Sequence, residues 1–185
     1  MKISLSLLEL KKGIGIIVRG VSSKPHLPIL SGILLRVKEN KVSLESTDLE
    51  VSFWVSLSAS VETEGEVVIP AKLFSEFVNS LSDERVDIEV VGGKMKVSAR
   101  DVTSEIVCQT ADDFPVIPRS TGSMLKIDSA VFKEKINKVN VSTAKEDTRP
   151  ILTGVLWELV ESGLNLVATD GFRLSTEVLP VKDIK

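Results

Sequence analysis

The sequence contains few of the residues from which catalytic and metal centres are built. Among 185 residues there is one histidine, one cysteine and no tyrosine, and aromatic residues make up 4%. A single cysteine cannot form an internal disulfide, and Cys108 with His26 is not a zinc cluster. Asp48 and Asp170 fall at strand corners, where aspartate usually serves a turn. We therefore expect no enzyme activity, no metal and no cofactor.

Long apolar runs and an excess of positive charge are lacking too. No run approaches membrane-spanning length, and Glu9, Lys11 and Lys12 come too early for a signal peptide, so we expect a cytoplasmic protein. The net charge of -3 argues against a basic module that binds nucleic acid freely by neutralising phosphates. It still allows a protein that is held on nucleic acid by other means.

An internal repeat is the most informative feature that the chain does have. Residues 28–34 (Pro-Ile-Leu-Ser-Gly-Ile-Leu) align without a gap with residues 150–156 (Pro-Ile-Leu-Thr-Gly-Val-Leu), an offset of 122 (150 minus 28). At the same offset, the Thr-Asp pair at 47–48 aligns with the Thr-Asp pair at 169–170. A repeat as long as a domain indicates duplicated domains.

The apolar pattern predicts one unit, of order β-α-β-β-β, three times. The first unit has a strand at 1–5, a helix from Ser6 to about Gly20, and strands at 31–37, 42–47 and 51–57. The second has a strand at 67–69, a helix at 71–81 that Pro70 introduces, and strands at 86–91, 95–99 and 105–109. The third has a strand at 125–127, a helix at 129–141 capped by Asp128, and strands at 154–159, 164–169 and 174–178.

The segment at 112–123 has the composition of a linker, with two prolines followed by a Ser/Thr/Gly stretch. Since two units make a domain, we expect a complete domain at 1–120 and the first half of a second at 121–185. Either the natural protein is longer, or a partner completes the second domain.

Five short strings stand in the order and spacing of a known family. They are Leu-Pro-Ile-Leu at 27–30, Thr-Asp-Leu-Glu at 47–50, Pro-Ala-Lys at 70–72, Ala-Asp-Asp-Phe-Pro at 111–115 and Ala-Thr-Asp-Gly-Phe-Arg-Leu at 168–174. In these strings and in its repeat, the whole chain resembles the bacterial sliding clamp, the beta subunit of DNA polymerase III.

The resemblance implies an α+β clamp fold, with helices lining the inner face and antiparallel sheets outside. The family's chain has three such domains and closes head-to-tail as a dimer into a ring around duplex DNA. A clamp loader places this processivity factor on DNA, where it tethers the DNA polymerase III alpha subunit and other polymerases. The alternatives are a truncated clamp-like protein that binds polymerase or loader peptides without encircling DNA, and a repeat-built scaffold with no DNA role.

Two helices at equivalent repeat positions are basic. The first carries Lys11 and Lys12, and the third carries Lys133, Lys135 and Lys138. A ring held by topology needs only a mildly positive inner wall, although solvated helix faces can have the same composition. By resemblance, loop and helix-start lysines also touch DNA. The candidate DNA-binding residues are Lys11, Lys12, Lys24, Lys72, Lys135, Lys138 and Lys145.

The string at 169–174 is the candidate peptide site. By resemblance it lines, with Leu152, a pocket for short peptides of polymerases and the clamp loader. Its chemistry fits, because a tight turn would leave Phe172 and Leu174 as apolar surface and Arg173 as a charged rim. The alternative is an ordinary hairpin corner with core side chains. The pocket candidates are Leu152, Thr169, Gly171, Phe172, Arg173 and Leu174.

The second helix offers candidates for a subunit interface. Phe74 is expected in the core, whereas Leu73 and Phe77 are either core residues or ring-closing contacts. By resemblance, this edge of the first domain faces the partner subunit.

Overall fold

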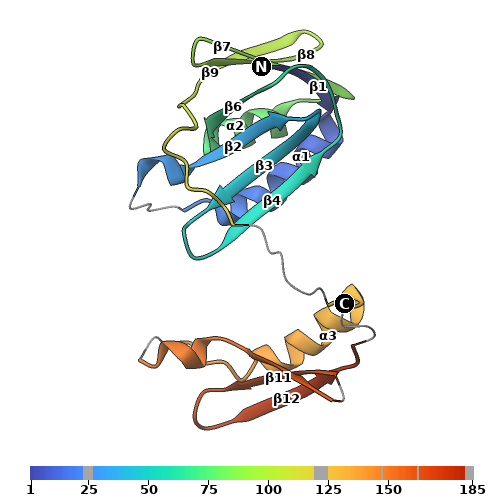
Figure 1. Cartoon of the computed structure of the whole chain (residues 1–185), viewed down its shortest axis with the longest axis vertical. Helices are drawn as coiled ribbons and strands as arrows, with labels where there is room; N and C mark the ends of the chain where they lie inside the picture. The colour runs from blue at the N-terminus through green and yellow to red at the C-terminus, as the bar shows by residue number, and fades with distance from the viewer. Residues whose placement is uncertain (23–26, 119–124, 147, 162, 182–185) are drawn as a thin grey trace. The chain divides into compact units, whose positions relative to one another are not determined.

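The computed structural model describes residues 1–22, 27–118, 125–146, 148–161 and 163–181. The chain forms two compact units, Met1–Pro118 and Arg119–Lys185, and each is described here by itself. Both are α+β, with antiparallel sheets and helices packed on one sheet face (Figure 1). Within the described ranges, no helix is long and apolar enough to cross a membrane.

The first unit contains nine strands and two α-helices among its described residues. Its first half consists of β1 (Lys2–Ser6), α1 (Leu7–Ile17), β2 (Gly32–Lys38), β3 (Lys41–Thr47), β4 (Ser52–Leu57) and β5 (Ala59–Thr63). Its second half consists of β6 (Gly65–Pro70), α2 (Ala71–Ser80), β7 (Arg85–Val91), β8 (Lys94–Ala99) and β9 (Val102–Val107). Short 3-10 turns lie at Val18–Gly20 and Pro28–Ser31.

The two halves of the first unit exchange their first strands. One sheet has the order β5-β1-β7-β8-β9 and the other the order β4-β3-β2-β6. Thus β1 joins the strands that follow α2, and β6 joins the strands that follow α1. Both exchanged pairs are antiparallel, and in each the residue before the helix faces the first residue of the partner strand: Ser6 faces Arg85, and Pro70 faces Gly32.

One hydrophobic core holds the first unit together. The helix α1 buries Leu10, Ile14 and Ile17, and α2 buries Phe74, which was expected in the core. These side chains form a single cluster with residues from both sheets, such as Leu35 of β2. Because each sheet contains strands from both halves, neither half can form this core alone.

The second unit has one helix and one three-stranded sheet among its described residues. Its elements are α3 (Ser129–Asn140), a 3-10 turn (Pro150–Thr153), β10 (Leu156–Val160), β11 (Gly163–Thr169) and β12 (Leu174–Leu179), with sheet order β10-β11-β12. As predicted, Asp128 caps α3, and its carboxylate accepts hydrogen bonds from the amides of Ala130 and Val131 at 3.0 Å. Ser6 stands at the same place before α1 but makes no side-chain capping bond.

The structure corrects three expectations. A short strand that was not predicted, β5, pairs with β1 at the sheet edge, and its mostly polar sequence gives little alternation to detect. Part of the expected linker is packed, because Phe114 is buried with Leu34 and Val68 on the outer face of the four-stranded sheet. The strand expected at 125–127 is absent from the described residues, where only Leu125 has a single bridge.

The missing strand has a physical explanation in the first unit. Its counterpart β1 is held between β5 and β7, which come from other parts of the chain. The described residues of the second unit include no equivalent of β7, so the segment at 125–127 has no such partner among them.

Close packing at the strand exchange gives a first prediction. Gly32→Ala should lower the free energy of unfolding of the first unit by about 1–3 kcal/mol, because the added Cβ would overlap Val68 Cγ1 and lie 3.1 Å from the Ile69 carbonyl oxygen. Gly15→Ala is the control. Among the described residues nothing lies within 4 Å of that Cβ on α1, so it should raise stability by about 0.5–1 kcal/mol. Urea unfolding followed by circular dichroism measures the free energy of unfolding of both variants. Equal changes in the two variants would contradict the close packing described at Gly32.

Candidate functional site

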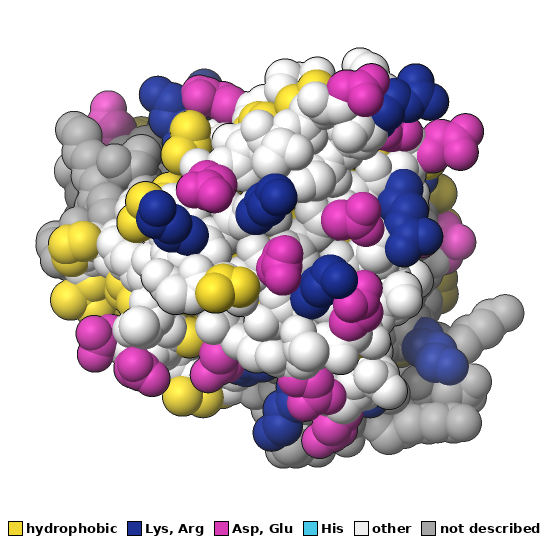
Figure 2. All heavy atoms as spheres, turned by 90° about the horizontal axis from the view of Figure 1, so that it is seen from above, with side chains coloured by type: hydrophobic (Ala, Val, Ile, Leu, Met, Phe, Trp, Pro, Cys, Tyr) yellow, Lys and Arg dark blue, Asp and Glu magenta, His cyan; other side chains and the backbone are white. Residues whose placement is uncertain are grey.

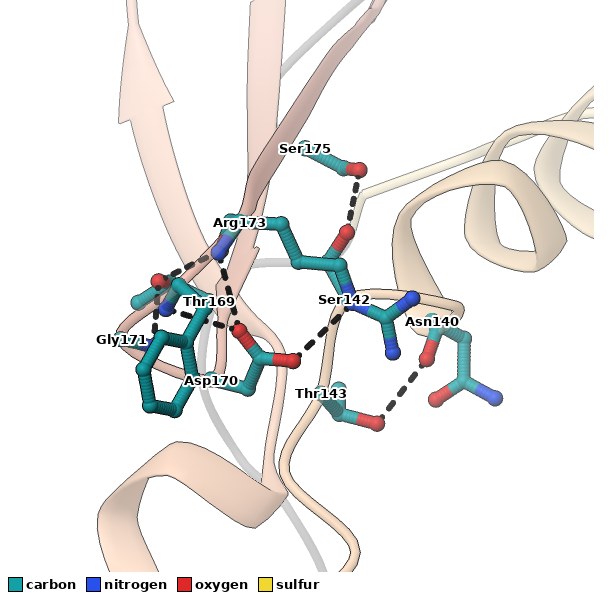
Figure 3. A network of polar contacts seen from close by, with 9 residues as sticks. Asn140, Ser142, Thr143, Thr169, Asp170, Gly171, Arg173 and Ser175 are labelled. Carbon is teal, nitrogen blue, oxygen red and sulfur yellow. Dashed lines mark hydrogen bonds and ion pairs between the residues drawn. The ribbon is translucent and has the colours of Figure 1, made fainter.

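The corner between β11 and β12 is built by the side chains of Thr169 and Asp170 (Figure 3). The Thr169 hydroxyl donates to the carbonyl oxygen of Arg173 at 2.7 Å and accepts from the amide of Gly171 at 3.1 Å. One Asp170 carboxylate oxygen accepts from the amides of Phe172 and Arg173, both at 3.0 Å. Four backbone groups of a tight turn are therefore satisfied by two side chains.

The same hydrogen bonds recur in the first unit, at the offset that the sequence repeat gives. Thr47 bonds the backbone of Leu49 and Val51, and Asp48 accepts from the amides of Glu50 and Val51. Leu49 has a φ of 80°, a strained value for a leucine, whereas Gly171 has the equivalent conformation (φ 91°) without a side-chain penalty. The Thr-Asp pair thus encodes the corner, and Gly171 relieves it in the second unit.

Hydrogen bonding keeps Asp170 ionised. The amides of Arg173 and Phe172 lower the pKa of its carboxyl group, and the Arg173 guanidinium, 3.0 Å from the second carboxylate oxygen, lowers it further. Through this ion pair, Asp170 also holds the Arg173 side chain against the corner.

Apolar side chains project from this corner and from the nearby 3-10 turn. Phe172 is 98% exposed, Leu174 is 65% exposed and Ile151 is 88% exposed, while Leu152 is half-buried. The sequence repeat contained Ile151, but the pattern gave no sign that it would be exposed.

Two contacts tie the loop after α3 to these segments. The hydroxyls of Ser142 and Ser175 lie 2.6 Å apart, and the amide of Ala144 donates to the carbonyl oxygen of Leu152. Ser142, which sequence reasoning did not select, is almost fully buried where it makes this link to β12. The corner, the loop and the 3-10 turn therefore form one structured surface.

The candidate DNA-binding lysines have different surroundings. Lys11 donates to the carbonyl oxygens of Asn79 and Leu81 at the end of α2, at 3.3 and 2.8 Å. Lys135 pairs with Glu177, and Lys138 pairs with Glu134 at 2.6 Å. Lys12, Lys72 and Lys145 are exposed, and Lys24 lies outside the described residues.

The charges on the surface are mixed in sign. The face shown in Figure 2 carries acidic and basic side chains side by side. On the five-stranded sheet, Lys2 pairs with Glu62 at 2.7 Å and Lys94 with Glu105 at 3.8 Å. Such pairing leaves little net field on this sheet.

The candidate interface residues of α2 differ in exposure. Leu73 is 52% exposed, and Phe77 is half-buried against the core. Two further residues that sequence reasoning missed, Val91 on β7 and Val107 on the edge strand β9, are also exposed. The exposure of Val107 fits the edge position of β9, which local patterns do not reveal.

The one cysteine of the chain is buried. Burial raises the pKa of the Cys108 thiol to about 11, so the reactive thiolate is scarce at neutral pH. No group of three or more potential metal-ligating residues lies together in the described ranges.

Sequence comparison decides the family. Residues 1–118 match the N-terminal domain of the DNA polymerase III beta subunit, and residues 126–185 match its central domain. The chain belongs to this family. It is 34% identical to the beta sliding clamp of Micrococcus luteus, over 85% of this chain and 51% of that protein. It is 28% identical to the beta sliding clamp of Streptomyces coelicolor, over 95% of this chain and 46% of that protein.

Solved clamps have the same fold. The match to the Bacillus subtilis sliding clamp covers 99% of this chain and 51% of the clamp's chain, with a TM-score of 0.92 and 26% identity. The match to the Thermotoga maritima beta subunit covers 100% of this chain and 51% of that subunit's chain, with a TM-score of 0.85 and 31% identity. The match to a Pseudomonas aeruginosa clamp that was solved bound to griselimycin covers 100% of this chain and 52% of that clamp's chain, with a TM-score of 0.87 and 29% identity. The chain spans about half the length of the curated relatives it matches.

The corner predicts a depressed pKa for Asp170. Its side-chain carboxyl should titrate below the usual value of 3.8, because the folded turn stabilises the ionised form. The stabilisation is therefore present at pH values above the unfolded pKa and is lost as the pH falls through the lower, folded value. Carbon-detected NMR titration measures the pKa.

An Arg173→Gln variant separates the causes of this shift. Its Asp170 pKa should rise only part of the way to the usual value, because the amides of residues 172 and 173 still donate. A titration at or above 3.8 in the unmodified chain would contradict the described corner.

Proposed function

We propose that this chain acts as a sliding-clamp segment, a processivity factor that encloses duplex DNA in an assembled ring and tethers the replicative polymerase. Its membership of the DNA polymerase III beta subunit family supports this proposal most directly. A clamp loader would place the ring on DNA, inside the cytoplasm. The mechanism is mechanical: no bond is made or broken, and retention comes from enclosure.

The charge distribution fits enclosure better than tight binding. Several candidate lysines are already engaged: Lys11 with backbone carbonyls, and Lys135 and Lys138 with glutamates. Lysines that are already paired release fewer counterions from DNA, which weakens the grip on it. We propose that Lys12, Lys72 and Lys145, which are exposed, make the phosphate contacts, with Lys24, Lys11, Lys135 and Lys138 as further candidates.

The corner of the second unit is proposed as the peptide-docking surface. Phe172, Leu174 and Leu152 would receive the apolar side chains of a short peptide, and Arg173, held by Asp170, would meet its polar groups. Thr169 and Gly171 set the shape of this surface. The peptides would come from the DNA polymerase III alpha subunit, other polymerases and the clamp loader.

Ring closure would use partly exposed apolar side chains of the first unit. Leu73 and Phe77 on α2 are the proposed contacts, and the exposed Val107 on β9 extends the same apolar character to a sheet edge. An edge strand with unpaired backbone groups is suited to pairing with another chain.

A topological experiment tests enclosure. After incubation with a clamp loader and ATP, the chain should stay on nicked circular DNA through a high-salt wash, because enclosure does not depend on phosphate contacts. Cutting the circle should release it. Equal loss from circular and linear DNA would favour the alternative, a truncated clamp-like protein that binds partner peptides without encircling DNA.

A peptide titration tests the docking surface. A peptide of the form Gln-Leu-x-Leu-Phe should shift the NMR signals of residues 169–174, and Phe172→Ala should weaken binding about tenfold or more, as for a central apolar contact. Glu50→Ala is the matched control, because Glu50 occupies the position of Phe172 in the corner of the first unit. Equal affinities for both variants would remove Phe172 from the site.

A further inference from the structure

The helix α3 and the strand β12 are joined by a network of ion pairs. Lys135 of α3 pairs with one carboxylate oxygen of Glu177 on β12. The Lys138 ammonium lies 3.9 Å from the other carboxylate oxygen of Glu177, and 2.6 Å from the carboxylate of Glu134, which is one helical turn away on α3. Two glutamates therefore offset the charge of two candidate DNA-binding lysines.

The equivalent contact in the first unit contains no charge. At the repeat offset of 122, Lys135 aligns with Gly13 of α1. Glu177 aligns with Val55 of β4. A Cβ at Gly13 would lie 3.6 Å from Val55 Cγ1 and 2.9 Å from Leu57 Cδ2. The helix and the strand of the first unit thus meet at this point through apolar groups, so the fold does not require an ion pair here.

The ion pairs lie within one half of a domain, because they involve only α3 and β12. The strand β12 corresponds to β4, which is still the edge of its sheet in the first unit, although both halves are present there. On the helix, Lys133 aligns with Lys11, which is the lysine that reaches the other half, at the end of α2. The network around Glu177 therefore does not need a second half of the domain to form.

The lysines of the network are charged but remain within reach of solvent. The hydrogen bond to Glu134 and the charge of Glu134 raise the pKa of Lys138, and the charge of Glu177 raises it further. The side chain of Lys138 is 52% exposed and that of Lys135 is 26% exposed. Because partly exposed ion pairs are weak, a polyanion can compete with the glutamates for these lysines.

We propose that Glu177 is a positioning residue that limits how much positive charge α3 presents to DNA. The inference rests on the proposed function, in which Lys135 and Lys138 are candidates for phosphate contacts. A lysine held by Glu177 must leave this carboxylate before it can bind a phosphate, so the glutamate competes directly with the DNA. Glu177 thereby lowers both the affinity for DNA and the number of counterions released on binding. Weak phosphate contacts suit a protein that must move along DNA.

This role differs from that of an ion pair that only stabilises the fold. If Glu177 were merely structural, Glu177→Gln would change the free energy of unfolding and leave the affinity for DNA as it was. A positioning role predicts tighter DNA binding instead. Glutamine keeps the size of the side chain, and the first unit tolerates a neutral residue at the equivalent position, Val55, so the variant should fold.

A salt titration of DNA binding tests this role in the full 185-residue chain. Binding of a short fluorescent duplex is measured over a series of salt concentrations for the unmodified chain and for Glu177→Gln. The variant should bind about threefold to tenfold more tightly at low salt. Its slope of log K against log salt should be steeper by about one to two, because up to two more lysines are free to meet phosphates.

Glu62→Gln is the matched control. It removes the same charge and breaks one ion pair, because Glu62 pairs with Lys2 at 2.7 Å, but this pair lies on the five-stranded sheet of the first unit. An effect of net charge alone should appear equally in both variants. A double-mutant cycle adds a second control: Lys135→Gln should cost more affinity in the Glu177→Gln chain than in the unmodified chain.

Lysine acetylation followed by mass spectrometry separates the possible outcomes. Without DNA, Lys135 should react faster in Glu177→Gln than in the unmodified chain, because its ion pair is lost. Equal affinities and salt slopes for Glu177→Gln and Glu62→Gln would overturn the role of Glu177, even where DNA protects Lys12, Lys72 and Lys145 from acetylation. If DNA protects none of these lysines in any form of the chain, the proposed DNA contacts themselves are wrong, and this inference with them.

Discussion

The fold depends on one constraint: an apolar strand in the middle of a clamp sheet must be paired on both edges. In the first unit the exchange of β1 and β6 between the two halves meets this constraint and joins both sheets into one core. The same constraint explains the second unit, where the residues of β10 are as apolar as those of β2 but are exposed.

The proposed docking surface depends on one corner of the second unit. The corner joins β11 to β12, whereas β10 forms the opposite edge of the three-stranded sheet. Docking of a partner peptide at the corner therefore does not require the edge of β10.

Local patterns predicted much of this structure because its elements are encoded locally. The stripe of Leu10, Ile14 and Ile17 gave the first helix, Asp128 gave the start of α3, and the family resemblance agreed with the fold. The recurrence of Thr-Asp predicted a repeated corner, and the structure shows why: these two side chains satisfy the turn by themselves.

Features that depend on distant partners were missed. The strand exchange, the edge position of β9 and the burial of Phe114 on the four-stranded sheet all depend on which segments meet in space. The candidate site shows the same division, since the turn was predictable but the links through Ser142 and Ala144 were not. The engagement of Lys11 by the end of α2 was likewise hidden, because its acceptors are backbone carbonyls about seventy residues away.

Amide hydrogen exchange tests the central claim, that pairing of both strand edges holds these sheets together. The account predicts slow exchange in β2, because β3 and β6 cover both of its edges, and faster exchange in β10, which pairs only with β11 among the described residues. Protection of β10 that equals that of β2 would contradict the account.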